Sequence, residues 1–196
     1  EYTILNIPYA QYIKGDLDFA KNIVIDNRNS IAFHIGGGIA IPYGNARMIP
    51  FEKRYFSGGA NSVRGWSVRS LGPGTFSDEK GNFMNQSGDI KLDASIEYRT
   101  RLFWKFRGAL FVDAGNIWTI REYQDQPGGK FKFDQFYKQI AVAYGVGLRL
   151  DLDFFVLRFD GGMKAINPEK GKDRYPILRS DFGRDFAFHF AVGYPF

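Results

Sequence analysis

The most regular alternation of hydrophobic and polar positions runs over the last eleven residues, 186–196. Small or polar residues alternate there with one apolar and largely aromatic set: Phe186, Phe188, Phe190, Val192, Tyr194 and Phe196. This period of two is that of a β-strand, whose successive side chains point to opposite faces. In water such a strand is an aggregation hazard, whereas in a transmembrane barrel lipid covers its outward face. The pattern therefore indicates the closing strand of a membrane barrel.

The same period recurs along the chain, with no convincing period of 3.6 residues. It predicts about seven strands, at 9–25, 31–41, 90–103, 108–118, 142–152, 155–163 and 186–196. Most are near the 9–11 residues that cross a bilayer at a tilt. The turn-rich tetrapeptide 26–29 joins the first two strands as a hairpin, and a segment rich in Gly, Ser, Asn and Pro, 43–89, follows them. We expect an all-β, antiparallel, meandering sheet.

The second face of each strand distinguishes a barrel from a soluble sandwich. A sandwich packs apolar faces together and turns mixed polar faces to water. Here the polar faces carry small residues and opposed charges: Glu97, Arg99, Asp113, Arg149, Asp151, Arg158 and Asp160. This favours a barrel with a polar lumen. A soluble all-β binding domain with charged outer faces would show a similar pattern and stays open as an alternative.

Composition narrows the function classes. The 196 residues are 44% hydrophobic and 17% aromatic, yet no run approaches the roughly 20 apolar residues of a transmembrane helix,. There is no Cys, so neither a disulfide framework nor thiolate chemistry is expected,. The net charge of +5 comes from dispersed basic residues beside 21 acids. That dispersal argues against a nucleic-acid-binding surface, which concentrates its basic residues.

Few residues suggest catalysis. The two histidines, His34 and His189, each stand alone on a small-residue face, whereas a metal site needs three or four ligands. Three acids, Asp151, Asp153 and Asp160, are interleaved with arginines. Charge pairing across strands explains them better than a calcium site or an acid–base pair. We expect no enzyme activity, no metal and no cofactor.

Two internal motifs carry a family resemblance. The segment 56–74 reads FSGGANSVRGWSVRSLGPG and contains Val63-Arg64-Gly65-Trp66, and Phe111-Val112-Asp113-Ala114-Gly115 follows downstream. With the Phe196 ending, the chain resembles the BamA/TamA superfamily of outer-membrane assembly barrels from about Tyr9 onward. That family has a Val-Arg-Gly-aromatic hallmark in its in-folded sixth extracellular loop and a Phe-x-Asp-x-Gly strand motif, which here places Phe111 and Gly115. Residues 11–14 and 192–196 look most like the TamA-related lipoprotein branch of Bacteroidetes-type bacteria.

The resemblance implies a domain organisation. Family barrels have sixteen strands in the bacterial outer membrane, so residues 1–196 correspond to the C-terminal part of one, with 43–89 as the in-folded loop. The other barrel half, or partner subunits, and the periplasmic domains would lie outside this chain. The chain starts at Glu1 without an initiator Met or signal segment, and we expect further sequence upstream.

The loop hallmark also has a physical reading. A guanidinium presents five donors in a rigid fork that suits carboxylates, and Glu97 and Asp113 are expected to face the lumen at similar depth. By resemblance, Arg64 is the loop-tip arginine and these two acids are its partners. Gly65 would allow a tight turn, and Trp66 would pack against the inner wall. In the alternative, Arg64 is exposed and Glu97 pairs only with neighbouring arginines.

The function implied by resemblance is the insertion or export of β-barrel or surface proteins without ATP, through a lateral seam. Outer-membrane lipid and unfolded outer-membrane proteins would be the partners. The terminal strand would serve as insertion signal and gate, through Phe188, Phe190, Val192, Tyr194 and Phe196. A passive outer-membrane pore or two-partner secretion channel is the alternative.

Overall fold

A computed structural model describes residues 3–4, 7–78 and 84–196. Its main element is a seven-stranded antiparallel sheet in which each strand pairs with the next along the chain. The strands are β3 (Gln11–Val24), β4 (Asn29–Tyr43), β5 (Ile90–Arg101), β6 (Phe106–Trp118), β7 (Ala141–Asp151), β8 (Val156–Ile166) and β9 (Phe186–Val192). The predicted meander of about seven strands is confirmed, with bounds shifted by a few residues.

The remaining elements are short. Two-residue strands β1 (Thr3–Ile4) and β2 (Ile7–Pro8) form a separate pair ahead of the sheet. The helical turns are η1 (Phe51–Lys53), η2 (Phe136–Gln139), η3 (Pro168–Asp173), η4 (Pro176–Leu178) and α1 (Phe182–Asp185). Within the described ranges, no helix has the length and apolar character needed to span a membrane.

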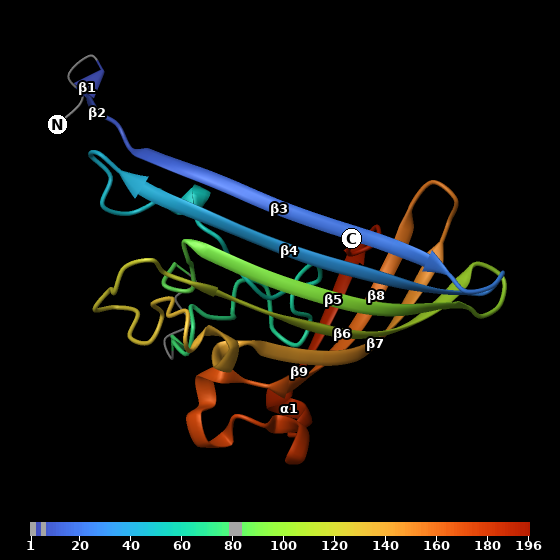
Figure 1. Cartoon of the computed structure of the whole chain (residues 1–196). Coiled ribbons are helices and arrows are strands. Elements are labelled where there is room, and N and C mark those ends of the chain that lie inside the picture. Colours follow the sequence, from blue (N-terminus) through green and yellow to red (C-terminus); the bar gives the residue numbers. More distant parts are fainter. Residues whose placement is uncertain (1–2, 5–6, 79–83) are drawn as a thin grey trace.

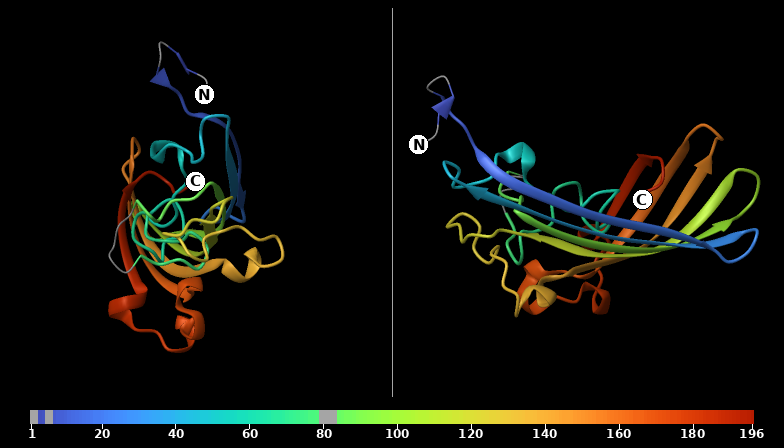
Figure 2. Two further views of the ribbon diagram at one scale, coloured as in Figure 1. Left: turned by 90° about the vertical axis from the view of Figure 1, so that its left-hand side faces the viewer. Right: turned by 45° about the horizontal axis from the view of Figure 1, so that its top comes forward.

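The sheet is curved, and its two faces have opposite character (Figures 1 and 2). The convex outer face exposes apolar side chains, such as Leu17 at 84% and Leu110 at 58% of their full accessible area. Charged groups such as Glu97 and Arg149 are fully buried on the inner side. A protein that buries its charges and exposes its apolar rows suits a lipid environment outside. The alternation therefore indicates the wall of a membrane barrel rather than a soluble sandwich.

The connections differ at the two ends of the sheet. Residues 25–28, 102–105 and 152–155 make short turns at one end, and 44–89, 119–140 and 167–185 make long loops at the other. Outer-membrane barrels have short periplasmic turns and longer extracellular loops, which orients the sheet. Among the described residues, β3 and β9 are the unpaired edges, so this part of the barrel stays open.

The described parts of the loop between β4 and β5, residues 44–78 and 84–89, fold back onto the concave face of the sheet (Figure 2). One apolar cluster joins the loop to β7 through Val63, Trp66, Leu71, Ala141 and Ala143. A second joins it to β4 and β6 through Ala40, Ile49, Tyr55 and Ile117. These two clusters attach the described part of the loop to the inner face of the sheet.

The terminal strand is shorter than predicted. β9 ends at Val192, because Gly193 takes a left-handed φ of +89° that interrupts the pleat,. Phe188, Phe190 and Val192 remain on the exposed outer face. The expectation that Tyr194 and Phe196 continue this row is wrong. Instead the guanidinium of Arg99 lies over both rings, and the Phe196 ring stacks on His34 of the inner face.

Candidate functional site

The tip of the long loop is a compact turn built on two glycines. Gly58 and Gly59 have φ values of +93° and +102°, and the Gly59 N–H donates to the Trp66 carbonyl at 2.9 Å. A Cβ on Gly58 would lie 2.4 Å from the Ser67 carbonyl oxygen, so only glycine fits there,. This turn holds the Val-Arg-Gly-Trp motif against the wall and points Arg64 at the strands.

Arg64 binds both acids expected to face it. Its Nε and Nη2 donate to the two carboxylate oxygens of Asp113 at 2.8 and 2.9 Å, and its backbone N–H donates to Asp113 at 3.0 Å. Nη1 donates to Glu97 at 2.6 Å. Arg64 keeps only 1% of its accessible area, which contradicts the alternative of an exposed loop residue. The bidentate fork fixes both position and orientation.

The strand motif supplies a second contact to the same guanidinium. Phe111 lies on the inner face of β6, and the Arg64 Cζ sits 3.5 Å from the centre of its ring. Gly115 of the same motif allows β5 and β6 to approach, since a Cβ there would lie 2.6 Å from the Leu92 carbonyl oxygen. The motif thus combines a ring, a carboxylate at Asp113 and a close strand pairing.

The ion pairs continue beyond the two expected acids. Arg149 bridges Glu97 at 2.9 Å and Asp160 at 2.7 Å, and Asp160 also lies 3.3 Å from Nη1 of Arg64. Arg158 lies 3.4 Å from Asp160. Sequence reasoning placed these charges on the inner face but did not connect them to the loop. The signal available in the sequence was that these charged residues share one face of their strands with small residues, which leave room for a loop.

Glycine and histidine residues complete the part of the sheet that contacts the loop tip. We call this set of contacts around Arg64 the loop seat. Gly162 of β8 faces the Arg64 carbonyl group, and a Cβ added to Gly162 would lie 2.2 Å from that carbonyl oxygen. A Cβ added to Gly65 would lie 2.8 Å from the Cβ of Ala143. His189 of β9, expected to be a lumen residue, donates from Nε2 to the Arg64 carbonyl oxygen at 3.0 Å. Four strands, β5, β6, β8 and β9, therefore contact one arginine.

The same loop is also tied to its neighbour at the extracellular end. The Gly72 N–H donates to Glu169 Oε1 at 3.3 Å. Burial raises the pKa of the Glu169 carboxyl, against the lowering effect of this hydrogen bond,. The loop is thus held both deep in the lumen and near its mouth.

The acids of this site form hydrogen bonds and ion pairs with more than one partner. Each acid in contact with Arg64 also binds another polar side chain, including the Ser95 hydroxyl, which donates to Asp113. Within 3–4, 7–78 and 84–196, no group of three or more His, Cys, Asp or Glu is placed to hold a metal ion. The arrangement holds a loop to a wall. The exposed residues of β9, Phe188, Phe190 and Val192, lie on the opposite face.

Comparison with known proteins identifies the family. A model of the Omp85 superfamily domain matches residues 8–196. The chain belongs to the Omp85 superfamily. This Omp85 chain is 30% identical over 183 residues to the outer membrane protein assembly factor BamA of Neisseria meningitidis, covering 83% of the chain and 21% of BamA. It is 28% identical over 160 residues to the human sorting and assembly machinery component 50 homolog, covering 76% of the chain and 33% of that protein.

Solved structures show the same fold. BamA from Haemophilus ducreyi lacking POTRA domains 1–3 superposes with a TM-score of 0.66 at 22% identity, covering 93% of this chain and 35% of that one. CdiB from Acinetobacter baumannii gives 0.54 at 18% identity, over 94% and 27%. The chain spans between a fifth and about a third of the relatives it matches. These relationships confirm a β-barrel of the bacterial outer membrane.

Proposed function

We propose that this chain is the C-terminal part of a barrel that inserts or exports β-barrel or surface proteins at the outer membrane. The observation that carries the proposal is the seat of Arg64. It locks the loop to β5 and β6 through Glu97 and Asp113 and reaches Asp160 on β8. Assembly and sorting factors among the relatives support the same role.

The proposed insertion or export of a protein needs neither ATP nor a covalent intermediate. The charged groups at the loop seat are paired, and the burial of apolar strands in the bilayer supplies the free energy of insertion. Outer-membrane lipid, unfolded outer-membrane proteins, the upstream barrel half and periplasmic domains or partner subunits are the proposed partners.

The proposed gate is the free edge of β9. It is the shortest strand of the main sheet, with seven residues, and Gly193 and Pro195 follow it. Gly193 interrupts the pleat, and Pro195 has no N–H to donate to a neighbouring strand. An incoming strand pairs with such an edge through its backbone, as in β-augmentation. The apolar side chains at every second position of β9 give that pairing its register.

A disulfide lock tests this gate. The full-length protein, with one Cys at Val192 and another in the first strand of the completed barrel, is reconstituted into liposomes. Folding of an unfolded outer-membrane protein is followed by its resistance to protease. We expect little folding when the disulfide is oxidised and recovery after reduction. Full activity in the locked protein would contradict the seam and favour a path through the lumen.

A passive pore or two-partner secretion channel is the competing function, because it can carry the same loop. The two functions predict different effects of deleting the loop. Deletion of 56–71 would sharply raise single-channel conductance in a pore that the loop merely plugs. An assembly factor instead loses substrate folding when the loop is removed.

A further inference from the structure

A row of arginines crosses the inner face of the sheet. The strand register places Arg101 of β5 opposite Arg107 of β6, Arg107 opposite Arg149 of β7, and Arg149 opposite Arg158 of β8. Backbones of neighbouring strands are about 4.8 Å apart, and like charges directly opposite one another destabilise a sheet. The row therefore requires anions along its length.

The buried half of the row has its anions within the protein. Arg149 lies between Glu97 and Asp160, and Arg158 contacts Asp160. Both arginines keep at most 1% of their accessible area. This half belongs to the seat of the loop.

The other half of the row, Arg101 and Arg107, lies beside the short turns, and its positive charges are only partly paired with acids. Arg107 contacts Asp151 at 2.6 Å. Arg101, and Arg28 from the turn 25–28, are exposed. Neither has an acidic side chain within ion-pair distance in the part of the chain that the structure describes.

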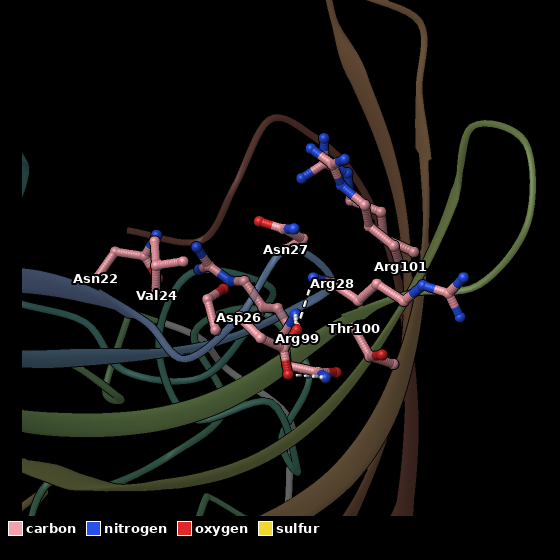
Figure 3. A pocket seen from close by; sticks show the side chains of 11 residues that line it. Asn22, Val24, Asp26, Asn27, Arg28, Arg99, Thr100 and Arg101 are labelled. Atoms are coloured by element: carbon pink, nitrogen blue, oxygen red, sulfur yellow. Dashed lines mark hydrogen bonds between the residues drawn. The ribbon is translucent and has the colours of Figure 1, made fainter.

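A pocket of about 410 Å³ opens between these groups (Figure 3). Its charged lining comprises four arginines, Arg28, Arg99, Arg101 and Arg107, and one acid, Asp26. The Asp26 carboxylate accepts two backbone N–H groups of its own turn, at 2.7 and 2.9 Å. Nη2 of Arg99 is buried without a hydrogen-bond partner among the described residues. Arg99 and Arg107 are paired with Glu97 and Asp151, at 2.8 and 2.6 Å. The exposed guanidiniums of Arg28 and Arg101 therefore leave donors free at the pocket, with almost no free acceptor charge beside them.

We infer that this pocket binds an acidic segment of polypeptide on the periplasmic side of the barrel. It lies on the inner face, which lipid chains do not reach, and beside the short turns that mark the periplasmic end. Guanidinium forks bind carboxylates in two-point contacts. Arginines spread over a turn and two strands match several carboxylates on one chain better than one small anion.

The binding site can be tested without any insertion assay. The full-length protein in uncharged detergent micelles is titrated against a rhodamine-labelled hexaglutamate peptide, with fluorescence anisotropy as the readout. The variants Arg28→Gln and Arg101→Gln each remove one exposed positive charge and leave the contacts of Arg64 unchanged. Arg121→Gln makes the same charge change in an exposed residue at the extracellular end and serves as the matched control.

The expected result is salt-sensitive binding that each of the two pocket variants weakens about tenfold, while Arg121→Gln leaves it unchanged. Hexaglutamine should not bind. Equal affinity in all variants would overturn the site. Binding of inorganic phosphate without binding of the peptide would overturn the polypeptide assignment. Displacement of the peptide by phosphatidylglycerol added to the micelles, dependent on Arg101, would also overturn it in favour of a lipid headgroup.

Discussion

The guanidinium of Arg64 lies over the ring of Phe111, with Cζ 3.5 Å from the ring centre, while the next inward residue of β6, Asp113, binds the same guanidinium at two points. One strand face thus contributes a π-surface and a carboxylate to one arginine from a loop. A cation over an aromatic ring gains roughly 0.5–2 kcal/mol, most when desolvated. The contact therefore adds to the ion pair instead of merely filling space beside it.

Replacement of Phe111 by Leu should loosen the loop without unfolding the strands. Leu retains most of the apolar volume but not the ring face, so we expect a loss of about 1 kcal/mol in loop docking. The rate of protease cleavage within 56–71 reports this loss. Phe188→Leu on the lipid-facing side is the matched control and should leave cleavage unchanged. Equal effects of the two changes would show that the ring face of Phe111 is not used.

Removal of Arg64 should have a larger effect. Breaking a buried ion pair by deleting one partner costs roughly 3–5 kcal/mol, because the remaining charge is left uncompensated. Arg64→Ala should therefore expose 56–71 to protease while β5 and β6 stay paired. Arg64→Lys, which keeps the charge but not the two-point fork, should fall between Ala and wild type.

The two acids provide an independent check of this anchor. Glu97→Gln and Asp113→Asn keep side-chain size and remove charge, so both should increase cleavage of 56–71. Unchanged cleavage in Arg64→Ala, Glu97→Gln and Asp113→Asn alike would leave the anchor without support.

The close approach between Gly162 and the loop tip leads to a further prediction. A Cβ there would lie 2.2 Å from the Arg64 carbonyl oxygen, so Gly162→Ala should push the loop tip from the wall. Gly15→Ala in β3 adds the same atom where nothing lies within 4 Å and serves as the control. Hydrogen exchange of the 58–66 amides should rise only in Gly162→Ala. A rise in both, or in neither, would show that the glycine face is not the seat of the loop.

The opposite character of the two sheet faces can be read position by position. Oxygen dissolved in the lipid should speed the relaxation of spin labels at Leu110, Val112, Leu148 and Phe188. Labels at Glu97, Asp113 and Arg149 should report water or protein. Val112 and Asp113 are adjacent in sequence, so they form the sharpest pair. Similar accessibility at both would contradict the barrel wall.

Sequence pattern predicted the strands and their inward charges, because alternation is a local property of each strand. The contacts of Arg64 with Glu97 and Asp113 were expected only from the family resemblance of the loop motif. The pattern did not predict the end of β9, since the φ of Gly193 depends on how the chain leaves the sheet. It also missed the arginine row. Opposition of Arg101, Arg107 and Arg149 depends on register between strands, which turn lengths and packing set together.

Site-specific photo-crosslinking tests the central claim, that substrate strands enter at the free edge of β9. Val192 on this edge and Leu110 in the middle of the sheet are similarly exposed on the outer face, at 64% and 58%. A crosslinker at each position is activated while the full-length protein in liposomes folds an outer-membrane substrate. The account predicts substrate adducts at Val192 and few at Leu110. Equal adducts at the two positions, or adducts only at an inward position such as Ser62, would contradict it.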